Sequence, residues 1–152
     1  MADWIDTEAK LAATSFDAPW LMALDCFEGY THLRITAGGK WEMLPGLSIQ
    51  CGPDGRSDIP IASDALLLPS CRPGALIGKI GGSSASLDRP AAPGADPVAG
   101  EPAVFAIGSA CIVALKDLPL GPLFVGINIE ARPLAIETLD LKVFGANLSP
   151  PG

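Results

Sequence analysis

The chain has 152 residues, of which 49% are hydrophobic and 18% are charged, and its 10 Lys and Arg against 17 Asp and Glu give a formal net charge of −7. This length fits a single domain with one core, and the acidic balance argues against a nucleic-acid-binding surface, which must be basic to follow phosphates. The high apolar share indicates that part of the surface is covered by a protein partner.

The N-terminal segment, residues 1–18, is predicted to form a short helix or an arm. Good helix formers occupy residues 8–13, and Asp6 or Thr7 can cap a helix there. Acidic residues follow Met1 closely, where a secretory signal would carry a basic region, so a cytoplasmic location is expected.

The same arm carries apolar side chains ahead of the main domain. Trp4 is suited to anchor a partner chain, because large aromatic side chains supply much of the binding free energy at protein interfaces. The candidate docking residues are therefore Trp4, Ile5, Leu11 and Phe16.

From residue 19 to residue 145, brief apolar runs alternate with Gly, Pro and Asp, a rhythm typical of an all-β domain with short strands. Gly38 and Gly39 are expected to end the second strand, and residues 51–55 are expected to form a surface turn. Such strands predict two antiparallel sheets packed as a β-sandwich. The expected strands are residues 20–26, 31–37, 41–50, 65–68, 76–80, 104–107, 110–115, 123–129 and 139–144.

Two further segments complete the predicted organisation. Residues 82–103 are rich in Gly, Ser, Ala and Pro, so they are expected to form a long, mobile surface loop, and residues 146–152 form a C-terminal tail. The longest uncharged apolar stretch, residues 102–115, is shorter than the roughly 20 residues that a spanning helix needs. A membrane-spanning helix is therefore not expected.

The cysteines and the single histidine do not form a recognisable chemical motif. Cys26, Cys51, Cys71 and Cys111 are widely spaced without a C-x-x-C pair, so neither a metal site nor another cofactor is expected. Buried free thiols are the preferred interpretation, with a Cys51–Cys71 disulfide as the alternative. His32 has no nucleophile motif beside it, so the chain is not expected to be an enzyme.

Three phrases occur in a fixed order along the chain: PGALIGKIG at residues 73–81, FAIGS at residues 105–109 and GPLFVGIN at residues 121–128. Together they resemble the PA-I-type galactophilic lectin family, and the resemblance covers roughly residues 20–144. It implies a jelly-roll-like β-sandwich similar to galactose-binding domains.

The resemblance also implies where a calcium and sugar site would lie. In that family an aspartate follows the position of Asn128, and a loop then supplies a threonine and two asparagines as calcium ligands. Here those positions fall on Ile129, Pro133, Ile136 and Glu137. Because calcium takes about six to eight oxygen ligands, calcium-dependent sugar binding is expected to be lost.

Two functions from different classes remain as expectations. The first is a non-enzymatic accessory or assembly subunit that docks on other proteins in a larger complex. The alternative is a calcium-independent carbohydrate-binding module that uses Asn128, Glu130, Arg132 and Glu137 at the former ligand loop.

Overall fold

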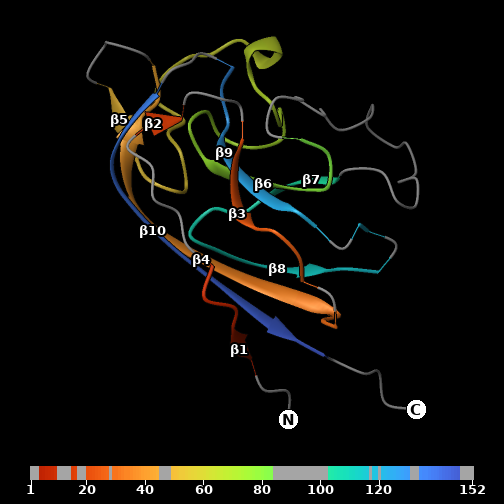
Figure 1. The fold of residues 1–152 in the computed structure, drawn as a ribbon. Coiled ribbons are helices and arrows are strands. Elements are labelled where there is room, and N and C mark those ends of the chain that lie inside the picture. Colours follow the sequence, from red (N-terminus) through yellow and green to blue (C-terminus); the bar gives the residue numbers. More distant parts are fainter. Residues whose placement is uncertain are drawn as a thin grey trace.

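The computed structural model describes residues 4–9, 15–16, 20–27, 29–44, 49–83, 103–116, 118–119, 121–130 and 134–147, with only the backbone described for residues 15, 16 and 63. Two antiparallel sheets pack against each other in these residues (Figure 1). The expected two-sheet antiparallel β-sandwich is confirmed.

The larger sheet is built around two long strands that pair along most of their length, β4 (His32–Glu42) and β10 (Leu134–Ala146). Its other strands are β1 (Ile5–Asp6), β2 (Ser15–Phe16), β5 (Gln50–Cys51) and β8 (Ala110–Ala114). The smaller sheet has the strand order β3 (Leu21–Leu24), β9 (Leu123–Ile127), β6 (Leu76–Ile80) and β7 (Ala103–Ala106).

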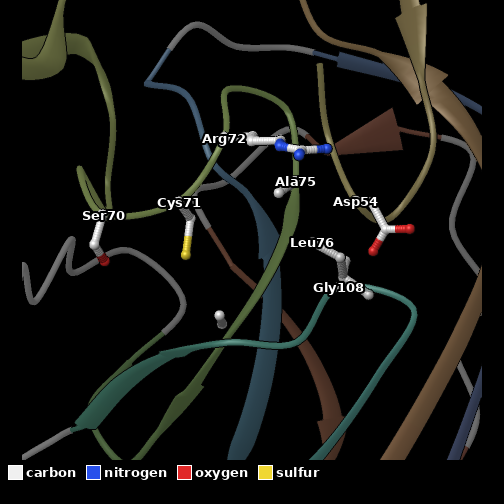
Figure 2. A pocket seen from close by; sticks show the side chains of 8 residues that line it. Asp54, Ser70, Cys71, Arg72, Ala75, Leu76 and Gly108 are labelled. Atoms are coloured by element: carbon white, nitrogen blue, oxygen red, sulfur yellow. The ribbon is translucent and has the colours of Figure 1, made fainter. Parts of the chain in front are cut away.

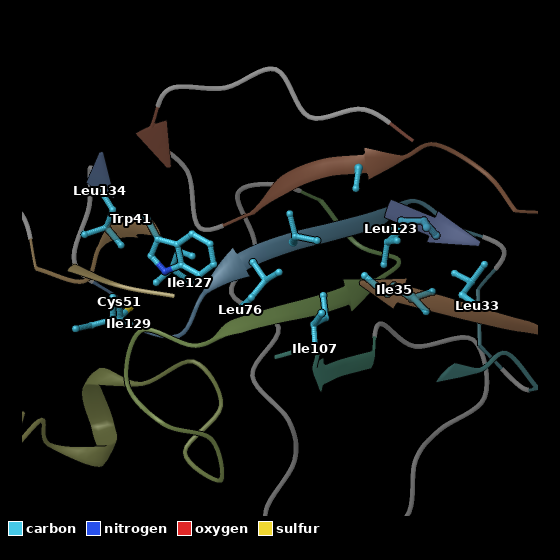
Figure 3. Packing of buried hydrophobic residues seen from close by; sticks show 14 of the residues in the cluster. Leu33, Ile35, Trp41, Cys51, Leu76, Ile107, Leu123, Ile127, Ile129 and Leu134 are labelled. Atoms are coloured by element: carbon cyan, nitrogen blue, oxygen red, sulfur yellow. The ribbon is translucent and has the colours of Figure 1, made fainter. Parts of the chain in front are cut away.

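The core lies between the two sheets and follows the period of two that strands impose on their side chains. In β4, Leu33 and Ile35 are fully buried, whereas Arg34 and Thr36 between and beside them are only partly buried. Figure 3 shows how buried side chains of the two sheets meet, with Leu33 and Ile35 packed in one cluster with Leu76.

A second cluster covers the opposite surface of the smaller sheet. Trp20, Ile77 and Phe124 pack there against Leu67 and Leu68. The predicted strand at residues 65–68 is therefore wrong: the chain forms a 3-10 turn, η1 (Ser63–Ala65), and the leucines that follow cover the sheet without joining it. A short apolar run does not distinguish a strand from a buried covering segment.

A buried cation belongs to this second cluster. Lys79 of β6 is fully buried, and its ammonium nitrogen lies 5.1 Å from the ring centres of both Trp20 and Phe124. The same nitrogen donates a hydrogen bond to the Ser83 carbonyl at 2.5 Å. Aromatic rings and a carbonyl thus replace part of the hydration that the charge loses on burial.

The prediction that Gly38 and Gly39 end the second strand is also wrong, because β4 continues through both residues to Glu42. Gly39 has φ +132°, and a β-carbon there would overlap the Thr138 carbonyl of β10. The pairing register between β4 and β10 shifts at this place, between Ile136 and Thr138. Glycine therefore permits a close backbone approach at a β-bulge.

The N-terminal arm contributes strands to the edge of the larger sheet. Ile5 and Asp6 of β1 pair with Gly145 and Phe144, while β2 pairs with the start of β10. The sequence predicts a short helix or an arm here, with helix formers at residues 8–13. Residues 10–13 lie outside the described residues, and residues 4–9 contain β1 and no helix.

The remaining predicted segments are described only in part. The strand expected at residues 41–50 is divided between the end of β4 and β5, and residues 45–48 between them lie outside the described residues. The turn after β5 is confirmed, because the Gly55 N–H donates to the Gly52 carbonyl at 3.0 Å. Residues 84–102 of the expected loop and residues 148–152 of the expected tail are not described.

Candidate functional site

The segment that follows β9 turns into the protein at Asn128. This residue is fully buried, and its side-chain oxygen accepts a hydrogen bond from the Leu68 N–H at 2.7 Å. Its amide nitrogen donates to the carbonyls of Leu68 at 2.9 Å, Cys71 at 3.2 Å and Arg72 at 3.1 Å. The Asn128 side chain therefore fastens the loop of residues 68–72 to the end of β9.

The next residues extend this attachment. Ile129 is 2% exposed and packs in the main core, where Figure 3 shows it beside Cys51. The backbone N–H of Glu130 donates to the Ala65 carbonyl at 2.9 Å. The chain thus uses this segment to hold residues 65–72 over the smaller sheet.

The four residues of the expected sugar-binding loop lie in different environments. Asn128 points inward, whereas Glu130 and Glu137 are exposed, and Arg132 lies outside the described residues. Pro133 is also outside them, and Ile136 packs against the main core. Within the described part of the chain, no group of three or more His, Cys, Asp and Glu side chains is placed to hold a metal ion.

Of the four docking residues predicted in the arm, the structure describes the side chains of only two. Trp4 lies on the larger sheet, with the Arg34 guanidinium 5.7 Å from its ring centre, and Ile5 is 54% exposed. Leu11 lies outside the described residues, and only the backbone of Phe16 is described. Trp4 thus packs on its own domain and leaves part of its surface accessible.

The surface around Trp4 contains residues that were not predicted from the sequence. Arg34 of β4 is paired in register with Phe144 of β10 on one side and with Ile112 of β8 on the other. Its guanidinium lies 4.9 Å from the Phe144 ring centre, and Ile112 is 61% exposed. We call this surface of the larger sheet, formed by Trp4, Arg34, Ile112 and Phe144, the outer face.

A shallow hollow of about 200 Å³ lies beside the outer face. It is formed where Gly38 lacks a side chain between Thr36, Asp140 and Lys142. A β-carbon built at Gly38 meets nothing within 4 Å, so the space is open. The outer face thus combines apolar, aromatic and charged groups next to a small depression.

All four cysteines are free thiols, so the structure does not contain the alternative Cys51–Cys71 disulfide. The Cys51 thiol donates to the Gly74 carbonyl at 3.2 Å, and burial raises its pKa to about 11. Burial likewise raises the pKa of Cys111 to about 11. Both thiols therefore stay protonated at neutral pH. The expectation of buried thiols holds for Cys51 alone, because Cys71 and Cys111 are partly buried and Cys26 is exposed.

Comparisons with known proteins do not assign a family: no family model matches the chain, and no curated protein matches it either. Among the described residues, no helix has the length and apolarity needed to cross a bilayer.

Proposed function

We propose that this protein is a non-enzymatic accessory subunit, a lectin-like β-sandwich that docks on another protein through its outer face. The observation that carries the proposal is the environment of Arg34. Its guanidinium lies against the rings of Trp4 and Phe144, beside the exposed Ile112. Aromatic residues and arginine are enriched where protein interfaces concentrate their binding energy.

The charge of Arg34 indicates the chemistry of the partner. The Arg34 Nε is buried without a hydrogen-bond partner, and no described residue forms an ion pair with the guanidinium. A carboxylate of the partner would pair with this planar group, while apolar side chains around it would cover Ile112. The proposed occupant is therefore a different protein that presents an Asp or Glu within an apolar patch.

The position of Asn128 supports docking over the carbohydrate-binding alternative. Its amide hydrogen-bonds to Leu68, Cys71 and Arg72 within the protein, so it is not at the surface where a sugar would bind. Specific binding on a glycan array in the presence of a chelator would favour the alternative instead.

The docking proposal is tested with two matched lysine substitutions. Ile112→Lys places a charge on the outer face, while Met22→Lys makes the same kind of change at a residue that is 52% exposed on β3 of the other sheet. The partner is first identified by native mass spectrometry of the tagged protein from its own cells. The affinity of the reconstituted complex is then measured for each variant.

We expect Ile112→Lys to weaken the complex at least about tenfold, equivalent to about 1.4 kcal/mol, and Met22→Lys to leave the affinity unchanged. Arg34→Lys should also weaken it, because lysine keeps the charge but loses the planar fork. Equal effects of the two lysine substitutions, or a protein that forms no complex in its cells, would contradict the proposal.

A further inference from the structure

A pocket of about 430 Å³ opens at the end of the sandwich, away from the residues of the outer face. Its polar side chains are Asp54, Ser70, Cys71 and Arg72, and its floor includes Leu76. Figure 2 shows Ser70 and Cys71 on one side of this space and Asp54 on the other, with Arg72 above them in the view. We call it the Arg72 pocket.

The walls of the Arg72 pocket are fixed by hydrogen bonds within the protein. Asn128 holds the backbone of Leu68, Cys71 and Arg72, as described above. On the opposite wall, the Asp54 carboxylate accepts a hydrogen bond from the Ser109 N–H at 3.1 Å. A loop backbone and a carboxylate that are held in place before a ligand arrives reduce the entropy that binding must overcome.

The polar side chains of the pocket can still form hydrogen bonds and ion pairs with a ligand. Among the described residues, no hydrogen bond or ion pair engages the Arg72 guanidinium, the Ser70 hydroxyl or the Cys71 thiol. Asp54 uses one carboxylate oxygen for Ser109 and keeps the other. The pocket therefore presents one cationic and one anionic group that are both accessible.

This pair of charges selects the class of ligand. A pure anion would be repelled by Asp54 and a pure cation by Arg72, whereas a molecule with both charges can pair with each. None of the described residues that line the pocket is aromatic, so it lacks the ring on which a sugar commonly stacks. The geometry points to a small zwitterion, a free amino acid, with its carboxylate on Arg72 and its ammonium group on Asp54.

This inference goes beyond the docking function and uses none of the residues of the outer face. The full-length protein is titrated with glycine, L-alanine and L-serine up to about 10 mM, a range that detects dissociation constants near 1 mM, or about 4 kcal/mol of binding. Binding is followed by nuclear magnetic resonance. The N-acetyl and methyl ester derivatives of the same amino acids each lack one charge, so each should bind at least about tenfold more weakly.

Two substitutions test the role of each wall. Arg72→Gln removes the cation, and Asp54→Asn removes the anion but keeps an acceptor for the Ser109 N–H. Each should weaken zwitterion binding at least about tenfold. Arg56→Gln is the matched control, because Arg56 lies outside the pocket and pairs with Asp58 at 2.6 Å.

The Cys71 thiol reports whether the ligand enters the pocket. With pKa values of about 11, Cys51 and Cys111 should react slowly with iodoacetamide at about pH 8, so Cys26 and Cys71 should be labelled first. A bound amino acid should slow the labelling of Cys71 and leave that of Cys26 unchanged. Absence of binding by all three amino acids, binding without protection of Cys71, binding that survives both substitutions, or binding of a neutral sugar instead would overturn the inference.

Discussion

Replacing Asn128 with alanine is expected to lower the free energy of unfolding by about 3 kcal/mol, because it leaves buried backbone groups without partners. The Leu68 N–H and the Cys71 carbonyl are the main losses. The Arg72 carbonyl still accepts a hydrogen bond from Ala75 at 3.2 Å. Chemical denaturation measures the change, with Asn147→Ala as control, because Asn147 is exposed.

The substitution Asn128→Asp separates a structural role from a role in binding a cation. A carboxylate at this position would face the carbonyl oxygens of Leu68, Cys71 and Arg72, so its pKa would be raised. The variant should therefore lose stability as the pH rises, since the folded state favours the protonated form. A change below about 1 kcal/mol for Asn128→Ala, or an aspartate variant as stable as the wild type at neutral pH, would contradict this account.

The substitution Gly39→Ala is expected to destabilise the protein by about 4 kcal/mol, combining backbone strain with a steric overlap. The added methyl group would overlap the Thr138 carbonyl, and φ +132° is unfavourable for alanine. Neither β4 nor β10 can move aside easily, since they pair over most of their length. The midpoint of chemical denaturation should fall accordingly.

The neighbouring residue provides the control for this prediction. A β-carbon at Gly38 meets nothing within 4 Å, so Gly38→Ala should change the free energy of unfolding by less than about 1 kcal/mol, in the stabilising direction. The two substitutions make the same change, glycine to alanine, at adjacent positions of β4. Similar effects for both would show that the close approach at Gly39 does not determine stability.

The short, continuous apolar strands were predictable from the sequence. The run at residues 76–80 ends at Gly81 and the run at residues 123–127 follows Pro122; they form the buried strands β6 and β9. The period of two also predicts that Ile112 and Ala114 share one side of β8. The period alone does not show that this side of β8 faces solvent, because the packing of the smaller sheet decides which side is buried.

The errors have identifiable physical causes. Two consecutive glycines normally end a strand, but at Gly39 the missing side chain allows the bulge that keeps β4 paired with β10. Leu67 and Leu68 have the composition of a strand, yet they cover the smaller sheet and pack there against Trp20 and Phe124, which lie far from them in the sequence.

The candidate sites were predictable only in part for a related reason. Asn128 stands at the end of an apparent strand, and its partners at Leu68 lie 60 positions earlier in the chain, so no local pattern reveals them. The contact between Trp4 and Arg34 likewise joins the arm to a strand of the main domain. Such pairings depend on how the sheets assemble.

The central claim is that the segment after β9 is a structural element rather than a ligand loop, and calcium titration tests it most directly. Asn128 and Ile129 are buried, so isothermal titration of the chelator-treated protein with calcium should give no stoichiometric binding, with or without galactose. A single calcium site with micromolar affinity that Asn128→Ala abolishes would contradict the claim and indicate a working sugar receptor.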